Sequence, residues 1–301
     1  MKTAFPASAA EWGENVQLGL SAFATPGFAQ TLANLPPNYP LQVMEWTVDQ
    51  FNFRPLPATE QAWVNSFADQ GRLIGHGVNY SLLSATHAAE NHKWLERLKT
   101  DPWLHRYDRL SVHFGFSTGW RMRQGAPLPV PLNTLTLECG HRWLDQLAEV
   151  VPCRIGIENL ALAFSRREVE QQGEFLEKLL APCNGYLLLD LHNLYCQSVN
   201  FGIDLMDLVK ACPLERVEEI HISGGSWSEH QGRTLRRDTH DDRVPDEIFS
   251  ALTAVIALCP HLKYIILEQL PNALTTAAQQ TAYQQDYARL WDTLRSQQQA
   301  A

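Results

Sequence analysis

The sequence YLLLDLHN at Tyr186–Asn193 indicates most directly how this chain folds. Its apolar residues follow one another without the polar alternation of a half-buried strand, and the run then reaches Asp190. A continuous apolar run of this kind is typical of a strand buried on both faces, as in a parallel sheet covered by helices. The acidic residue therefore falls at the strand end where parallel-sheet enzymes carry functional groups.

Seven other short apolar runs have the same form, and segments long enough for helices separate them. The eight runs are Val16–Ser21, Leu41–Trp46, Arg72–Val78, Arg109–Phe116, Arg154–Leu160, Tyr186–Asn193, Val217–Ser223 and Tyr264–Gln269. Segments with helical periodicity are Glu90–Lys99, Leu135–Val151, a segment that opens at Pro245, and Thr281–Gln297. This alternation predicts an α/β fold, a closed (β/α)8 TIM barrel with its site at the C-terminal mouth of the strands.

Length, composition and charge fit a single globular enzyme. The chain has 301 residues, 45% apolar and 19% charged, and α/β barrels of about 250 residues are single domains. We predict one domain over residues 1–301, with the barrel core at about residues 16–296. The net charge of −9 weighs against a nucleic-acid partner, because such partners call for a basic surface.

The expected compartment is the cytoplasm. The N-terminus shows no signal peptide, and no segment approaches the roughly 20 apolar residues of a membrane span. The six cysteines include no CxxC pair and are expected to be reduced thiols. We therefore expect no membrane association.

Seven of the eight runs end, or nearly end, in a metal-capable or acidic residue. These residues are Glu45, His76, His113, Glu158, Asp190 with Asn193, His221 and Glu268. A barrel brings strand ends together at one mouth, and buried carboxylates and imidazoles without matching cationic partners need cations between them. The pattern predicts a metalloenzyme with more than one metal ion.

The segment after the seventh run adds two further candidate ligands. Asp238 and His240 stand two residues apart, so in an extended segment they point the same way and can chelate one ion. Asn193 is close enough to Asp190 to offer an amide oxygen to a neighbouring ion. Oxygen and nitrogen ligands without cysteine fit iron, manganese or zinc, and the residue types do not choose among them.

Several nearby residues keep two interpretations. Glu45 either supports the site or binds substrate, or else forms an ion pair inside the barrel. His192 either supports the ligands beside Asp190 or, by strand alternation, turns with Asp190 towards the barrel interior. The loops Ser117–Asn133 and Gly224–Arg243 are expected to hang over the mouth. They contain either an anionic-substrate patch or a solvated basic stretch, made of Arg121, Arg123, Arg233, Arg236 and Arg237.

The order of motifs resembles the multinuclear non-haem iron-dependent oxidases, formerly a domain family of unknown function that includes methanobactin-oxidase-like proteins. The resemblance covers about residues 16–272, and its most specific stretch is LLLDLHNLYCQSVNFG at Leu187–Gly202. The other matching motifs are LPVPLN at Leu128–Asn133, IENLA at Ile157–Ala161, IHISGG at Ile220–Gly225 and DTHDDRVPDEIF at Asp238–Phe249. The chain departs from the family at His192, where asparagine is common, and at Ser223–Gly225 and His113–Phe116. The implied metal ligands are all present, so the departures bear on the choice of substrate.

The resemblance implies two to three iron ions in a mixed-valent Fe(II)/Fe(III) state. Its implied ligands for the first ion are Glu158, Asp190, His221 and Glu268; for the second, His76 and His113 with Glu158 bridging; and for a third, Asn193, Asp238 and His240. Glu158, Asp190 and His240 are expected to be catalytic.

Such enzymes use O2 to modify a ribosomally made precursor peptide, usually at cysteine and sometimes at aspartate or asparagine. Often a small partner protein delivers the peptide. The resemblance therefore implies an oxidoreductase of peptide biosynthesis, with a precursor peptide as substrate and a small partner protein.

Two other functions remain open at the level of sequence. Divalent-metal isomerases and phosphodiesterases of the xylose-isomerase or endonuclease type also gather histidines and carboxylates at barrel strand ends, with Mg, Mn or Zn. A catalytically inactive barrel that binds a peptide or partner is the third possibility. The complete ligand set argues against the inactive barrel, and the acidic charge argues against the endonuclease.

Overall fold

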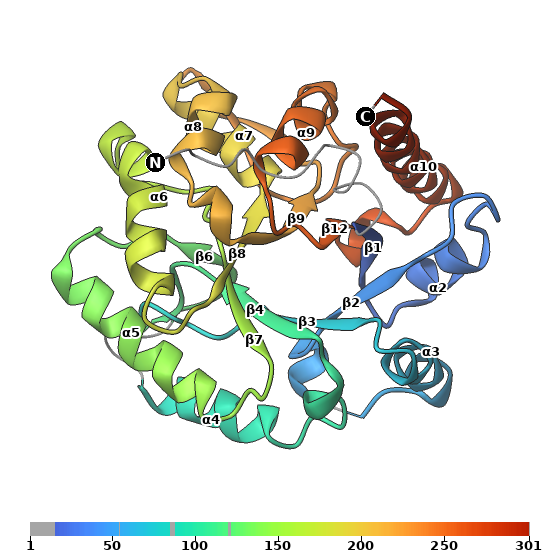
Figure 1. Ribbon diagram of the computed structural model, residues 1–301, viewed down its shortest axis with the longest axis horizontal. Coiled ribbons are helices and arrows are strands. Elements are labelled where there is room, and N and C mark those ends of the chain that lie inside the picture. The colour runs from blue at the N-terminus through green and yellow to red at the C-terminus, as the bar shows by residue number, and fades with distance from the viewer. Residues whose placement is uncertain (1–15, 54, 85–87, 120–121, 301) are drawn as a thin grey trace, which may run out of the picture.

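A closed barrel of eight parallel strands forms the centre of the computed structural model, which describes residues 16–53, 55–84, 88–119 and 122–300 (Figure 1). The barrel strands are β1 (Gln17–Ala22), β2 (Val43–Thr47), β3 (Leu73–Gly77), β4 (Arg109–His113), β7 (Arg154–Glu158), β8 (Tyr186–Asp190), β9 (Val217–Ile222) and β12 (Tyr264–Leu267). They neighbour one another in chain order, and β12 closes the ring against β1. The prediction of a (β/α)8 barrel is confirmed.

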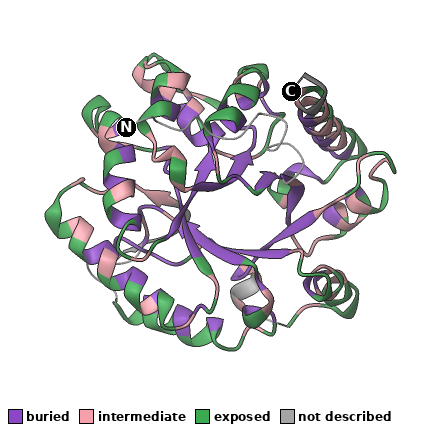
Figure 2. Ribbon diagram, in the orientation of Figure 1, coloured by how far each residue is buried: buried purple, intermediate pink, exposed green. Residues whose placement is uncertain are grey.

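Helices surround the barrel and turn their apolar faces to it (Figures 1 and 2). The α-helices are α2 (Pro26–Ala33), α3 (Ala58–Asp69), α4 (Ala88–Leu98), α5 (Thr134–Ala148), α6 (Arg166–Leu180), α7 (Leu191–Phe201), α8 (Leu205–Ala211), α9 (Asp246–Leu258) and α10 (Ala277–Ala300). Short 3-10 helices are η1 (Gln50–Phe53), η2 (Leu104–Arg106), η3 (Leu214–Arg216) and η4 (Pro271–Ala273). The four segments predicted as helices correspond to α4, α5, α9 and α10, with boundaries shifted by one to four residues.

Side chains fill the barrel interior near the N-terminal ends of the strands. Val43, Ile74, Tyr264 and Ile266 form an apolar cluster there, separate from the main core between strands and helices. Gly156 leaves room for the Tyr186 ring, because a Cβ at this glycine would lie 2.3 Å from that ring. The barrel is therefore a packed core rather than a pore.

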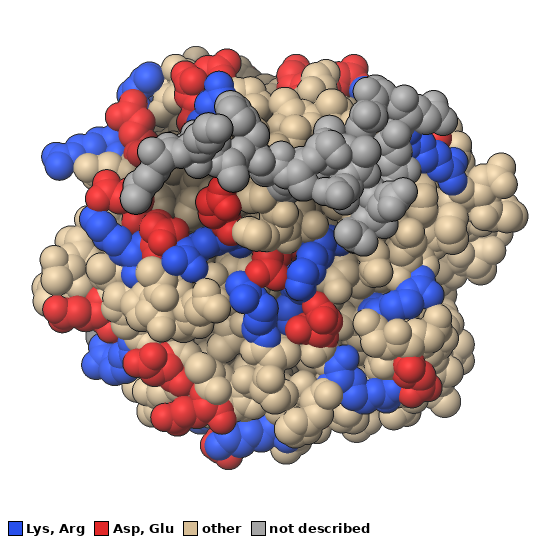
Figure 3. Space-filling view, viewed as in Figure 1, with Lys and Arg blue, Asp and Glu red and all other residues tan. Residues whose placement is uncertain are grey.

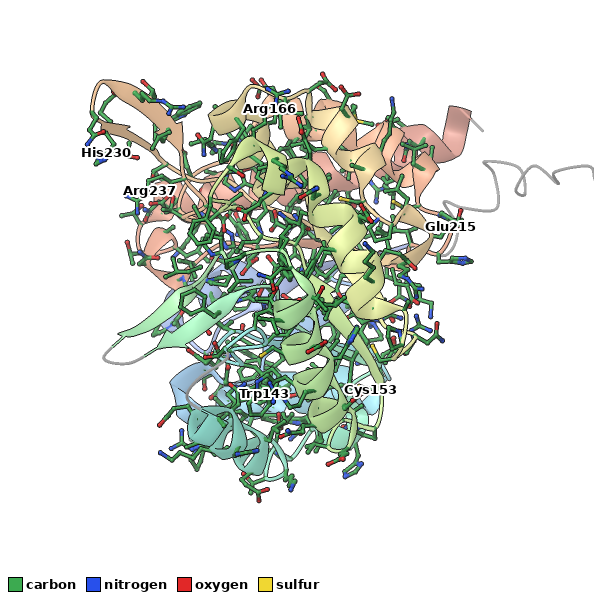
Figure 4. All side chains as sticks on the ribbon, turned by 90° about the vertical axis from the view of Figure 1, so that its left-hand side faces the viewer. Trp143, Cys153, Arg166, Glu215, His230 and Arg237 are labelled. Atoms are coloured by element: carbon green, nitrogen blue, oxygen red, sulfur yellow. The ribbon has the colours of Figure 1, made fainter. Side chains whose placement is uncertain are left out.

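Charged residues close the N-terminal end of the barrel. The fully buried Arg109 pairs with Glu218 at 2.7 Å and with Asp108 at 2.9 Å, and Arg154 also pairs with Glu218 at 2.6 Å. Figure 3 views this end, where basic and acidic side chains alternate near the centre of the face. In Figure 4 this end lies to the right, near the labelled Cys153 and Glu215.

Two antiparallel hairpins project at the opposite end of the barrel, on the left in Figure 4. They are β5 (Phe116–Gly119) with β6 (Met122–Leu128), and β10 (Trp227–His230) with β11 (Arg233–Arg236). The sequence predicted loops in both places. The β10–β11 turn holds Gln231 and Gly232 at φ 50° and 75°, the positive-φ pair that a tight hairpin turn requires.

The run at Tyr186–Asn193 contains less strand than the sequence suggested. β8 ends at Asp190, and α7 begins at Leu191. Asp190 is the N-cap of α7 and accepts the Asn193 backbone N–H at 2.6 Å. This bond satisfies a helix-terminal donor that would otherwise lack a partner. His192 and Asn193 are therefore in the first turn of a helix above the barrel, not on a strand.

Candidate metal centre

The C-terminal strand ends bring the predicted ligands of the barrel strands into one buried site. His113, Glu158 and Asp190 are the last residues of β4, β7 and β8, and Glu268 directly follows β12. The other members lie one or two residues before a strand end: Glu45 on β2, His76 on β3 and His221 on β9. All of them are buried except His113, which is partly exposed.

His76, His113 and Glu158 form the first group of ligand atoms. The Nε2 atoms of His76 and His113 are 3.1 Å apart and lie 3.4 and 3.3 Å from Oε2 of Glu158. Ligand atoms about 2.1 Å from one ion are separated by about 3.0 Å in octahedral and about 3.4 Å in tetrahedral geometry. The three atoms therefore have the mutual spacing of ligands to one ion.

The protonation of His76 suits metal binding, whereas His113 would lose a proton when it binds an ion. Burial, helped by His113 and His221, lowers the pKa of His76 well below its ordinary value, so its ring is neutral and offers a lone pair. Burial alone would lower the pKa of His113 too, but the Glu158 carboxylate raises it overall. Nδ1 of His76 hydrogen-bonds the Ser111 hydroxyl at 2.8 Å, which leaves Nε2 directed at the group.

Glu158, Asp190 and His221 form the second group, and Glu268 adjoins it. Nδ1 of His221 lies 3.2 Å from Oε2 of Glu268, and the ligand atoms of Glu158, Asp190 and His221 all lie within 4.8 Å of one another. Burial and the neighbouring carboxylates Asp238 and Glu158 raise the pKa of Asp190 well above its ordinary value. Carboxylates packed so closely need a cation to remain ionised together.

Glu45 holds the other ring nitrogen of His221. Its Oε2 lies 2.8 Å from Nε2 of His221, and neither residue has solvent exposure. A carboxylate that accepts from one ring nitrogen fixes the tautomer and frees the other nitrogen for a metal ion. Of the two interpretations that the sequence left open, the contact supports a residue that orients a ligand.

Asp238 and His240 form the third group with His192. Oδ1 of Asp238 lies 2.6 Å from Nε2 of His240 and 3.0 Å from Nδ1 of His192. Nδ1 of His240 lies 3.3 Å from Oε1 of Glu268, which links this group to the second. The backbone of His240 has φ 47°, a left-handed conformation that costs energy in a non-glycine residue and clusters at functional sites.

Asn193 faces the second group in this structure. Its side-chain amide donates to Oε1 of Glu158 at 3.1 Å and to the Asn159 carbonyl at 2.9 Å. Its Oδ1 is buried and accepts no hydrogen bond. The contact with Asp238 is made instead by its neighbour His192, whose role the sequence left open.

Three buried oxygens of the site have no hydrogen bond and are suited to bind cations. Oε2 of Glu158, Oδ2 of Asp190 and Oδ1 of Asn193 are all buried with no hydrogen-bond partner. Each such atom costs about 1–3 kcal/mol, and more when charged. Cations between these oxygens would remove the cost, so the residues present fit a multinuclear metal site.

One buried carboxylate of the site was missed in the sequence. Oε2 of Glu219 accepts from the Tyr186 hydroxyl at 3.0 Å, and its Oε1 lies 3.6 Å from Nε2 of His221. The signal was the period-2 alternation of a strand, which turns Glu219 to the same side as His221. The residue therefore forms a layer directly beneath the candidate metal site.

A known family matches most of this chain. Residues 25–282 match the family described as "RiPP precursor modification enzyme MbnB/TglH/ChrH", where RiPP stands for ribosomally synthesised and post-translationally modified peptide. The chain belongs to this family. The resemblance drawn from the sequence motifs is thereby confirmed, and the family is one of enzymes that modify precursor peptides.

Curated relatives carry a family name without an activity. A UPF0276 protein of Caulobacter vibrioides strain NA1000 is 30% identical over 187 residues, which are 60% of this chain and 62% of that protein. A UPF0276 protein of Chromobacterium violaceum is 28% identical over 200 residues, 66% of this chain and 70% of that protein. The chain thus spans about 62% of the length of the Caulobacter relative.

Solved structures share the fold. Endonuclease IV from Thermus thermophilus superposes with a TM-score of 0.56 at 17% identity, and the match covers 92% of this chain and 99% of the endonuclease chain. The IolI protein with a bound zinc atom has a TM-score of 0.58 at 12% identity, covering 93% and 99%. These similarities establish the TIM barrel alone. In the described part of this chain, no helix has the length and apolar character needed to cross a membrane.

Proposed function

We propose that this chain is an iron-dependent oxidase that uses O2 to modify one residue of a ribosomally made precursor peptide. Cysteine is the first candidate for that residue, and aspartate or asparagine is the alternative. Membership of a family of precursor-peptide modification enzymes supports the substrate class. The donor set of imidazoles and carboxylates is one that iron accepts, and the family resemblance selects iron among the metals that fit it.

The observation that carries the proposal is the sharing of ligands between groups. Glu158 belongs to the group of His76 and His113 and also to the group of Asp190 and His221. Asp190 in turn belongs to a further group with His240 and Glu268. A carboxylate common to two groups is suited to bridge two ions, which a mononuclear hydrolase site does not need. Two to three ions are therefore proposed.

The proposed ligands are those that the family resemblance implied. Glu158, Asp190, His221 and Glu268 would hold one ion, and His76 and His113, with Glu158 shared, a second. Asp238 and His240 would hold a third, and Asn193 would join them only if its side chain turned from its present contact with Glu158. When bound, a mixed-valent iron pair would supply a Lewis acid for the substrate thiolate or carboxylate and a redox centre for O2.

The protein side of the reaction consists of orientation and exclusion of water. Glu45 keeps the Nε2–H of His221 occupied, so the ring presents Nδ1. The His76, His221 and Glu158 side chains are at most 4% exposed, whereas His113 is 15% and Asp238 is 23% exposed. Substrate would thus enter over His113 and Asp238, beneath the two hairpins.

The proposed catalytic residues remain Glu158, Asp190 and His240, and each of them belongs to two of the ligand groups, as His221 also does. A small partner protein is proposed to deliver the peptide to the mouth. No nucleic acid and no membrane take part in the proposed reaction.

The test combines oxygen uptake with the mass of the peptide. Iron-loaded protein is mixed with candidate precursor peptides, encoded by short open reading frames beside its gene, together with any partner protein encoded there. We expect O2 consumption coupled to a mass change on one peptide residue, both abolished in Glu158→Gln. Turnover of sugar or phosphodiester substrates with Mg, Mn or Zn and without O2 would instead favour an isomerase or phosphodiesterase.

A further inference from the structure

Arg236, the last residue of β11, is a buried cation at the edge of the candidate metal site. The strand packs on α7, and the Asn200 side chain fixes the Arg236 backbone by accepting its N–H at 2.8 Å and donating to its carbonyl at 2.9 Å. The residue is 5% exposed. Figure 4 shows the adjoining Arg237, labelled, at the base of the projecting hairpin that ends at the labelled His230.

Two aromatic rings enclose the Arg236 guanidinium. Its central carbon lies 5.6 Å from the Tyr195 ring centroid and 5.2 Å from the Trp227 ring centroid. Within the described part of the chain, its one hydrogen bond from the side chain runs from Nε to Nε2 of His192 at 3.2 Å, and it forms no ion pair with a carboxylate.

Another buried arginine of the same chain is fully paired. Arg109 also lies near two aromatic rings, those of Tyr186 and Tyr264, but it binds the carboxylates of Glu218 and Asp108 as well. Burying an unpaired charge is costly, and cation–π contacts of about 1–2 kcal/mol offset the cost only in part. Arg236 therefore has the surroundings of an anion-binding site.

The free edge of the guanidinium determines which anion fits. His192 occupies Nε, so the two terminal amino groups remain as a flat fork. Such a fork matches the two oxygens of a carboxylate. The Trp227 side of the slot is open, because that residue is 50% exposed. A planar carboxylate entering along the two rings can bind both amino groups.

His192 connects this slot to the third ligand group. Its Nε2 accepts from Arg236, so the neutral ring carries its proton on Nδ1 and donates to Oδ1 of Asp238. The slot and Asp238 are therefore two hydrogen bonds apart. The sequence had left open whether the arginines near this loop bind an anion; Arg121 lies outside the described residues, as does the Arg123 side chain.

We propose that Arg236, enclosed by Trp227 and Tyr195, binds a carboxylate of the substrate peptide and so places a neighbouring peptide residue over the metal mouth. The assignment of the ligand to a peptide rests on the proposed function, whereas the carboxylate chemistry rests on the slot alone. The carboxylate comes either from the C-terminus of the peptide or from an aspartate or glutamate side chain.

The test measures peptide binding to metal-free protein by ligand-observed NMR, so that no metal ion can bind the carboxylate. The probes are N-acetyl-triglycine, its C-terminal amide, and N-acetyl-Gly-Asp-Gly-amide. We expect the carboxylate probes to bind about tenfold or more tightly than the amide. Binding of N-acetyl-triglycine alone would assign the C-terminus, and binding of the aspartyl probe alone would assign a side chain.

Substitutions locate the binding to the slot. Arg236→Gln should abolish the preference for the carboxylate, and Arg236→Lys should retain part of it. Arg237→Gln is the matched control, because it removes the same charge from an exposed neighbouring residue and should leave binding unchanged.

Equal binding of acid and amide by the wild-type protein would overturn the proposal, whatever the stability of the variants. An equal loss in Arg237→Gln would also overturn it, since it would reveal a general charge effect. Because the assay uses metal-free protein, it tests the carboxylate site separately from the proposed function. Absence of iron from the purified enzyme would contradict the proposed function but not the carboxylate site. An active iron oxidase without a preference for the carboxylate would contradict the carboxylate site alone.

Discussion

The Glu45–His221 contact leads to a sharp prediction about metal affinity. Glu45→Gln keeps an acceptor oxygen near Nε2 of His221 but removes the negative charge from a 2.8 Å contact with no solvent exposure. A hydrogen bond to a charged group contributes about 1.5–3 kcal/mol, and loss of a partner that orients a histidine ligand weakens metal binding by roughly 10–100-fold. We expect Glu45→Gln to weaken metal binding by about tenfold and Glu45→Ala by about 100-fold.

The stability of the metal-free protein should change much less than the affinity for metal. Burial raises the pKa of Glu45 to about 7, against the opposing effect of His221, and Glu219 lies nearby. Glu45→Gln removes this unfavourable burial together with the attraction between Glu45 and His221, whose pKa the carboxylate raises, so the two effects oppose each other and the metal-free variant should have a Tm close to that of the wild type. A residue with a merely structural role would lower the stability of the metal-free protein instead.

The assay is iron binding under anaerobic conditions, in competition with a chelator of known affinity, with Tm measured for each form. Glu215→Gln is the matched control, because Glu215 is 82% exposed at the opposite end of the barrel. Iron affinity unchanged in Glu45→Ala, combined with a lower Tm of the metal-free variant, would refute the assigned role of Glu45.

Three further predictions follow from the site and the barrel. Glu158→Ala should lower the number of metal ions per chain by more than one, because two ligand groups share this residue. Mass spectrometry counts the ions, and loss of a single ion would contradict the bridging role. Carboxylates raise the pKa of His221 and His240 above their ordinary values despite burial, so metal binding should release protons at pH 7. Calorimetry in buffers of different ionisation enthalpy measures this release. Metal affinity should rise with pH, and a pH-independent affinity would contradict the release of protons. Gly156→Ala should destabilise the fold by about 1–3 kcal/mol in urea unfolding, because its Cβ would lie 2.3 Å from the Tyr186 ring; an unchanged midpoint would mean that the interior can repack.

The barrel could be predicted from the sequence because each strand is buried on both faces and so forms a continuous apolar run. The strand-end residues were predictable for the same reason: a polar group that closes a buried run, as Glu158 does after Ile157, has few explanations other than function. Register alone then brings His113 beside Glu158, and His221 beside Asp190.

The start of α7, the two hairpins and the Arg236–His192 contact could not be predicted from the periodicity of the sequence. The capping bond of Asp190 starts a helix inside an apolar run, so His192 and Asn193 point in directions that strand alternation mispredicts. Both hairpins were read as loops, because β5, β10 and β11 have only four residues each and the side chains of β10 and β11 are largely exposed. The pairing of Arg236 with His192 crosses 44 residues, and no local pattern encodes it.

Iron content measures the central claim most directly. The protein is purified anaerobically from iron-supplemented cells, and its metals are counted by mass spectrometry. Two to three iron ions per chain are predicted from the ligand groups that share Glu158 and Asp190. Stoichiometric zinc, manganese or magnesium with little iron would contradict the oxidase and favour a divalent-metal isomerase or phosphodiesterase.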